Sequence, residues 1–478
     1  MGAQKIGLVV GPVVAGLMLL LGPPDGLNPA AWGTAALMVL MATWWATEAI
    51  PIPATSLLPL VVLPLVEAGT PRQVGADYAH YIVLLLLGGF IIAMGIERWD
   101  LHKRIALNVI ARVGAAPKSL IFGFMLATAM LSMWISNSAT TLMMMPIALS
   151  AAHALGDKSG KFAAALLLGV CYAASIGGVA TPIGTPTNLI AINWLQVEMG
   201  ASIGFPQWMA FGIPAAAVMI PIAWWAVTRS LPQLEGGHAV VERVREQLRS
   251  LGRMTQPEFR AALVFGVVAL LWVSRLWTVD LIDAVGWSVP KGFNGAEVDM
   301  MIAIAGGVMM FIVPAGGGEK RALLSWQEAE RLPWGVLVLF GGGIALGNAV
   351  SRTGLSEWLG SHLSVMSSFP PILFIAVVVM LVIFLTELTS NVATMTTLAP
   401  ILGALAVAVG MAPESLLGPA AVAASCAFML PVATAPNAIV YSTGQVPIQT
   451  MMRKGLAINL IGIGVITAIG YWIAPLVL

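Results

Sequence analysis

Long apolar runs separated by short polar or Pro- and Gly-rich segments dominate this amino-acid sequence. A run of about 20 apolar residues is long enough to cross a membrane as a helix. The pattern predicts an all-α polytopic protein with about eleven such spans, two of them broken by Pro-rich turns. The predicted spans cover residues 4–22, 30–49, 53–68, 79–97, 161–198 (broken), 207–228, 259–278, 298–314, 332–351, 418–446 (broken) and 455–477.

Two further apolar blocks, residues 119–155 and 370–409, carry polar side chains at their centres. The first cluster surrounds Ser136-Asn137 and the second surrounds Ser390-Asn391. Each block could form two complete spans. However, polar side chains at this depth need burial in protein or a wet cavity rather than in lipid. We therefore predict two re-entrant hairpins whose tips meet inside the membrane.

The two blocks belong to a repeat that covers the chain. An offset of 254 positions superimposes their polar centres, and an offset of 249 relates two later turns, residues 183–188 and 432–437. Repeated halves with broken apolar segments are typical of secondary transporters. Because the first hairpin starts from the inside and the second from the outside, we predict inverted repeats. The polar pairs at the 254-residue offset are Ser132 and Thr386, Ser136 and Ser390, and Asn137 and Asn391.

Composition and charge place the chain in the membrane and orient it. Hydrophobic residues make up 59% of the chain and charged residues only 9%. A soluble protein carries about a quarter charged residues, so this chain cannot cover a water-facing surface. A cytoplasmic N-terminus puts all but four of the 23 Lys and Arg residues on the cytoplasmic side of the inner membrane, with the C-terminus outside. The four exceptions are Arg72, Arg275, Lys291 and Arg352. The net charge of +1, without a basic domain, gives no support to nucleic-acid binding.

The longest polar segment, residues 229–258, is predicted to be a cytoplasmic linker. Its apolar positions would share one face of a helix, which fits equally well at the membrane surface or as a solvated linker helix. These positions are Val240, Val244, Leu248 and Leu251.

The two polar centres offer the chemistry of an anion site. Ser hydroxyls and Asn amide nitrogens donate hydrogen bonds to carboxylates, and helix N-termini add partial positive charge. Neither tip contains Lys or Arg, so bound cations would have to balance the anion. Side-chain oxygens and carbonyls freed at the Pro-rich breaks are ligands for Na⁺. A single Ser or Thr in an apolar helix more often bonds to its own backbone, but a duplicated set favours a shared site.

Two carboxylates lie deep in the predicted spans, Glu48 and Glu387. A carboxylate in a membrane indicates a cation or proton pathway. Glu48 precedes Pro51, so a structural bond to free backbone amides is an equal alternative, and Glu387 could orient the second tip. We find no nucleophile–base pair or metal cluster at either polar centre, which disfavours an enzyme. Cys171 and Cys426 are predicted to be small buried hydrophobic residues.

Together these motifs resemble the divalent anion/sodium symporter family, which contains the sodium-coupled dicarboxylate and citrate transporters. The resemblance covers nearly the whole chain. It implies a homodimer in which a scaffold domain holds still while a transport domain moves as an elevator. The motifs that carry it are Trp44-Trp45-Ala46-Thr47-Glu48-Ala49-Ile50-Pro51-Ile52-Pro53, Ser136-Asn137, Ile183-Gly184-Thr185-Pro186, Thr386-Glu387 and Ser390-Asn391. The implied division is scaffold 1–117 and 259–369, transport domain 118–228 and 370–478, and linker 229–258.

The resemblance also implies two Na⁺ sites, one at each tip with its neighbouring helix break. The first would use Ser132, Ser136, Asn137 and Gly184, and the second Thr386, Ser390, Asn391 and Ala433. The substrate would contact Ser136, Asn137, Ser138, Ser390, Asn391, Val392 and Thr434, with Thr185 and Ala435 as further candidates. The expected function is Na⁺-coupled transport of succinate, malate, fumarate or citrate. A Na⁺-independent dicarboxylate exchanger or a sulfate transporter of the same fold are the alternatives.

Overall fold

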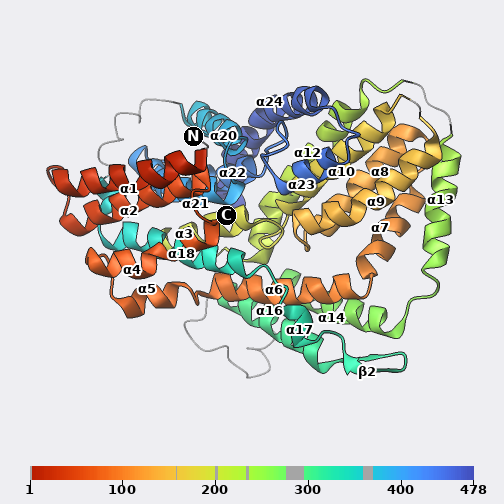
Figure 1. Cartoon of the computed structure of the whole chain (residues 1–478), viewed down its shortest axis with the longest axis horizontal. Coiled ribbons are helices and arrows are strands. Elements are labelled where there is room, and N and C mark those ends of the chain that lie inside the picture. Colours follow the sequence, from red (N-terminus) through yellow and green to blue (C-terminus); the bar gives the residue numbers. More distant parts are fainter. Residues whose placement is uncertain (1–2, 158, 200–202, 233–235, 276–294, 359–369) are drawn as a thin grey trace.

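The computed structural model describes residues 3–157, 159–199, 203–232, 236–275, 295–358 and 370–478, which are mostly helical (Figure 1). The end of the predicted span 259–278 and Lys291, which is predicted to be external, lie outside these ranges. Nine helices in the described residues are long and apolar enough to cross a membrane. The helices that follow the unbroken predicted spans are α1 (Ala3–Leu21), α2 (Pro29–Thr47), α6 (Tyr81–Arg98), α12 (Phe205–Thr228), α14 (Gln256–Val273), α16 (Gly295–Ile312), α18 (Trp334–Arg352) and α24 (Ile448–Trp472).

One predicted span differs from the structure, and several short elements were not predicted. Residues 53–68 form two short helices, α3 (Ile52–Thr55) and α4 (Leu58–Leu65), because Pro59 has no N–H for the carbonyl of Thr55. Hydropathy does not identify elements that are short or polar. The unpredicted elements are α5 (Pro71–Asp77), α7 (Leu101–Arg112), α17 (Trp326–Ala329) and the antiparallel strands β1 (Pro314–Gly316) and β2 (Glu319–Ala322). The short helix α25 (Ala474–Val477) forms the end of the predicted span 455–477.

The helices of the two halves repeat at the same offsets as the sequence motifs. The first hairpin consists of α8 (Pro117–Ser132) and α9 (Asn137–Leu155), and the second of α20 (Pro371–Thr386) and α21 (Asn391–Ala408). Three of the four helix boundaries correspond at the 254-residue offset. The broken helices are α10 (Lys161–Gly178) with α11 (Pro186–Met199), and α22 (Glu414–Ala424) with α23 (Ala435–Ser442). Their second segments begin at positions related by the 249-residue offset.

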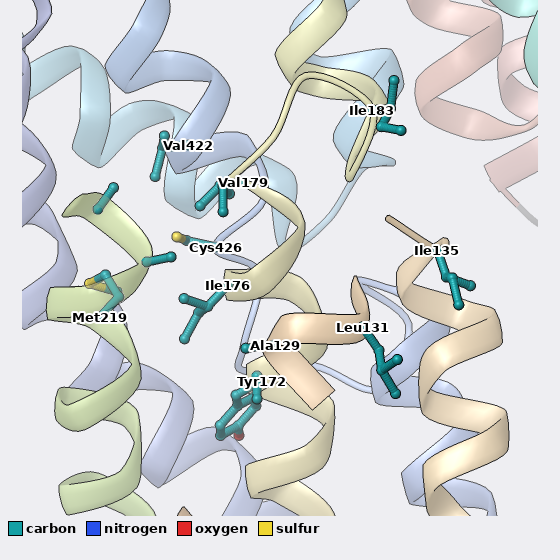
Figure 2. Packing of buried hydrophobic residues seen from close by; sticks show 14 of the residues in the cluster. Ala129, Leu131, Ile135, Tyr172, Ile176, Val179, Ile183, Met219, Val422 and Cys426 are labelled. Atoms are coloured by element: carbon teal, nitrogen blue, oxygen red, sulfur yellow. The ribbon is translucent and has the colours of Figure 1, made fainter. Parts of the chain in front are cut away.

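Helix α10 forms the buried centre of the first half and positions the first hairpin. It packs against α8, α9 and α12. Figure 2 shows Tyr172 and Ile176 projecting from α10, with Leu131 of α8 on one side and Met219 of α12 on the other. A Cβ at Gly177 would lie 2.5 Å from the Cα of Ala129, so the backbones of α10 and α8 touch directly. This contact fixes the depth at which the first hairpin ends.

Among its described residues, the linker segment includes the helix α13 (Gly237–Ser250), whose apolar face is covered by protein. Val240 and Val244 are buried, and α13 packs against α7 and α9, beside which it stands in Figure 1. Leu248 and Leu251 are partly buried against the same core. The interpretation of this face as a membrane-surface contact is therefore wrong, because neighbouring helices occupy it.

A buried ion pair connects α14 and α16 to the N-terminus of α12. Arg275 Nη1 lies 3.2 Å from Asp299 Oδ2, and both side chains are buried. The same Asp299 oxygen accepts a hydrogen bond from the backbone N–H of Phe205 at 3.0 Å. The ring of Phe205 stacks on Trp272 with centroids 4.1 Å apart. The N-terminal end of α12 is therefore bonded to α16 and packed against α14.

Candidate functional site

Both Ser-Asn turns line a single cavity of about 740 Å³. A sphere of that volume is about 11 Å across. The cavity lies between the hairpin tips, the helix breaks, the C-terminal end of α2, the middle of α6 and the N-terminal end of α18. All nine predicted substrate contacts line it, namely Ser136, Asn137, Ser138, Thr185, Ser390, Asn391, Val392, Thr434 and Ala435.

Four helices begin at residues that line this cavity. Helices α9 and α21 start at Asn137 and Asn391, and α11 and α23 start at Pro186 and Ala435. The hydroxyl oxygen of Ser136 caps α9 by accepting a hydrogen bond from the N–H of Ala139 at 3.3 Å. Each helix N-terminus carries a partial positive charge and unpaired N–H groups. The cavity can therefore attract an anion without any Lys or Arg side chain.

Behind each tip, oxygen atoms outnumber the protons available to them. Ser132 Oγ lies 2.7 Å from Asn137 Oδ1 and 2.7 Å from the carbonyl oxygen of Ala174. A hydroxyl has one proton, so it donates to only one of these oxygens at a time. The second half repeats the arrangement, since Thr386 Oγ1 lies 2.8 Å from Asn391 Oδ1 and 3.0 Å from a backbone carbonyl of α22. Such a surplus of oxygen lone pairs suits a hard cation such as Na⁺.

Glycines let the oxygens of the first site approach each other. A Cβ at Gly178 would lie 2.5 Å from Asn137 Oδ1 and 3.1 Å from the carbonyl oxygen of Gly184. A Cβ at Gly184 would lie 2.4 Å from the carbonyl oxygen of Gly178. Any side chain at these positions would occupy the space that the oxygens share. The predicted ligands Asn137 and Gly184 therefore converge, and Gly178 joins them.

Two buried asparagines hold the helix breaks in shape. Asn188 Nδ2 donates to the carbonyls of Gly178 and Thr181 at 3.0 and 2.7 Å. Asn437 Nδ2 donates to the carbonyls of Ala427 and Leu430 at 2.9 and 2.8 Å. Both asparagines are the last residues of the repeated turns 183–188 and 432–437, but the sequence alone assigned them no role. Their recurrence at the 249-residue offset is the signal that could have identified them.

Glu387 binds the backbone of the second break. Its carboxylate accepts hydrogen bonds from the N–H groups of Phe428, Met429 and Leu430, at 2.8 to 3.1 Å. Asn459 Nδ2 donates to it at 2.8 Å. The first half has Met133 at the corresponding position, and there the hydroxyl of Thr181 accepts from the N–H of Gly184 at 3.1 Å. The carboxylate therefore orients the second break rather than facing the cavity.

We expect Glu387→Gln to weaken cation binding at the predicted second site. The amide keeps the shape of the carboxylate but removes its charge and turns one acceptor into a donor that faces N–H groups. Losing charge-assisted hydrogen bonds costs about 1–3 kcal/mol. The thermal unfolding temperature of the purified variant should fall, and its increase on adding Na⁺ should shrink. An unchanged Na⁺ response would contradict this role, and Glu414→Gln, at the start of the same broken helix, serves as the control.

The pattern of the whole sequence matches one known family. The model of the sodium:sulfate symporter transmembrane region matches residues 3–478. The chain belongs to the sodium:sulfate symporter family. This family consists of transporters, so the chain is a membrane transporter and not an enzyme.

Relatives of this chain include the sodium-dependent dicarboxylate transporters SdcS. That of Staphylococcus saprophyticus is 40% identical over 99% of this chain and 92% of its own length. That of Staphylococcus aureus (strain MRSA252) is 42% identical over the same shares. These similarities confirm the resemblance drawn from the motifs.

Solved structures share the fold at low sequence identity. The antimetabolite efflux pump MtrF of Neisseria gonorrhoeae has a TM-score of 0.61 at 14% identity, covering 96% of this chain and 97% of its own. The YdaH transporter of Alcanivorax borkumensis has a TM-score of 0.60 at 14% identity, covering 93% and 98%. At this identity the likeness concerns the fold alone.

Proposed function

We propose that this chain carries dicarboxylates such as succinate, malate and fumarate across the cytoplasmic membrane, coupled to two or more Na⁺ ions. The observation that carries the proposal is the meeting of two repeated Ser-Asn turns in one cavity, each backed by an oxygen cluster. Relatives that share about two fifths of the sequence are sodium-dependent dicarboxylate transporters.

The shared cavity supports re-entrant hairpins over complete spans. A helix that crosses the hydrocarbon core covers about 30 Å, so the turns of two complete pairs of spans would lie at opposite membrane faces. Both turns instead line one cavity of about 740 Å³. Tips that reach the middle of the membrane from opposite sides satisfy this geometry.

The oxygen clusters favour Na⁺ coupling over an exchange that needs no Na⁺. Four helix N-termini and neutral hydroxyl and amide donors attract the carboxylates, while a cation behind each tip balances the charge. Ser138 keeps a hydroxyl where Val392 has none, so the two tips are chemically unequal. One end of the substrate would bond more fully than the other, which suits an elongated dicarboxylate better than a compact sulfate.

The residues in the cavity wall support an assignment of the side of the membrane that the cavity faces. The wall includes Gln4 at the start of α1, Glu48 after α2 and Pro333 before α18. The charge asymmetry assigns these three positions to the cytoplasmic side. We therefore interpret the structure as inward-facing. In an elevator cycle, residues 118–228 and 370–478 would move against the scaffold of a homodimer, and the hydrogen bond from the N–H of Phe205 to Asp299 would have to break.

Uptake into proteoliposomes tests the proposed function. Radiolabelled succinate, citrate and sulfate are offered with an inward Na⁺ gradient, with K⁺ in place of Na⁺, and with unlabelled dicarboxylate inside. We expect Na⁺-dependent accumulation of succinate. Uptake that needs internal dicarboxylate but no Na⁺ would favour the exchanger, and accumulation of sulfate alone would overturn the assignment of the substrate.

A further inference from the structure

Glu48 has a backbone conformation that its residue type does not favour. It ends α2 in the left-handed region, with φ of 47° and ψ of 41°. Gly or Asn usually occupies such a position, because a Cβ there costs about 1–2 kcal/mol. The backbone of the helix end therefore does not explain a glutamate, and a role of its side chain is the better explanation.

The Glu48 side chain is exposed and lines the cavity. Its carboxylate forms no ion pair or hydrogen bond with any residue that the structure describes. The structural bond to free backbone amides, considered from the sequence, is thus made by Glu387 and not by Glu48. Its neighbour Thr47 instead donates its hydroxyl proton to Thr43 within α2.

Within the described parts of the chain, Glu48 is the only charged residue that lines the cavity. The hydroxyls and amides of the tips are neutral, and the helix N-termini attract an anion more strongly the more charges it carries. Glu48 acts in the opposite direction, because it repels an anion in proportion to its charge. The two effects together can distinguish anions by charge number.

We propose that Glu48 sets the charge selectivity of the cavity, favouring divalent over trivalent carboxylates; this rests on the proposed transport function. At a separation of about 11 Å, the repulsion between Glu48 and each negative charge of the anion lowers the affinity for that anion. The factor is about two for an effective dielectric constant of about 80 and about ten for one of about 20. The affinity for a trivalent anion is therefore lowered by one such factor more than the affinity for a divalent anion. The same carboxylate also attracts Na⁺ toward the cavity.

Competition between two anions measures this selectivity. Unlabelled citrate and unlabelled succinate compete against labelled succinate at the cytoplasmic face of the protein, in proteoliposomes that hold it inside out. Na⁺ is saturating, and the pH is one where citrate is fully ionised. In Glu48→Gln, we expect the half-inhibiting concentration of citrate to fall relative to that of succinate by about two- to tenfold. Glu48→Asp, which keeps the negative charge, should show the same ratio as the parent protein.

Glu67 offers a matched control, because it is also an exposed glutamate in the left-handed region (φ of 58°) but does not line the cavity. Glu67→Gln should leave the ratio unchanged. If Glu48→Gln does not fold, the parent protein still tests the proposal. Choline chloride added at constant Na⁺ screens the repulsion and should improve citrate relative to succinate.

An unchanged ratio in Glu48→Gln, or a ratio in the parent protein that does not respond to salt, overturns the role of Glu48. A parent protein that takes up no carboxylate overturns the proposed function instead. The two failures are therefore distinguishable.

Discussion

Asn137→Ala should abolish Na⁺-driven uptake of succinate, and Asn391→Ala should do the same. Each asparagine offers two functions on one side chain. Its Oδ1 lies 2.7 or 2.8 Å from the hydroxyl of Ser132 or Thr386, in the oxygen cluster, while its amide nitrogen remains a donor beside the cavity. Alanine removes the cation ligand and the anion donor together.

The size of this effect follows from the cost of unpaired polar groups. Losing one buried polar partner costs about 1–3 kcal/mol, or about ten- to hundredfold in affinity. Because cation and anion sites both lose a partner, uptake should fall by about a hundredfold or more. Asn108→Ala, on α7 and remote from the cavity, is the control, because it removes an asparagine that bonds only to its own helix. Normal Na⁺ dependence in Asn137→Ala would show that the oxygen cluster is not a cation site.

The repeat allowed much of this site to be predicted from the sequence. Polar residues in a long apolar block stand out, and Ser136 forms an N-cap, so hairpin tips and helix boundaries follow from local residue types. Duplication at a fixed offset then identified which polar residues belong together. These signals depend on residues that are close in sequence or related by a constant spacing.

The missed features depend on contacts between distant segments. Glu387 bonds to amides about forty positions later, and Cys171 of α10 donates to Asn437 Oδ1 at 2.8 Å. Neither partner is marked by hydropathy or by a local motif. The amphipathic α13 was also ambiguous, because an apolar stripe is the same whether lipid or protein covers it. Such assignments need the packing of the folded chain.

The difference between Gly178 and Ala427 leads to the second prediction of large effect. These residues correspond at the 249-residue offset, and Gly184 corresponds to Ala433 in the same way. The proposed first cation site is therefore built around two glycines and the proposed second site around two alanines. At Gly178 a Cβ would lie 2.5 Å from Asn137 Oδ1, a separation that real Cβ atoms essentially never show.

We expect Gly178→Ala to displace Asn137 Oδ1 and to weaken the first Na⁺ site severely. The carbonyls of Gly178 and Gly184 are held by the backbone of the break, so the asparagine must move. Overpacking of this kind costs about 1–3 kcal/mol. If this cost destabilises the Na⁺-bound state, the half-saturating Na⁺ concentration rises by about ten- to hundredfold. The measurement is succinate uptake as a function of external Na⁺.

Ala427→Gly is the matched experiment in the second half. It removes a buried methyl group where no glycine is required, so it should cost the flexibility of glycine and the burial of one methyl group, about 1–2 kcal/mol of folding free energy. Its Na⁺ dependence should stay close to that of the parent protein. Equal Na⁺ dependence in both variants would mean that the crowding around Gly178 does not control cation binding, and the first site would have to be formed by other oxygens. A selective loss in Gly178→Ala would instead show that the two halves hold their cations in differently shaped sites, because only the first needs the space that glycine leaves.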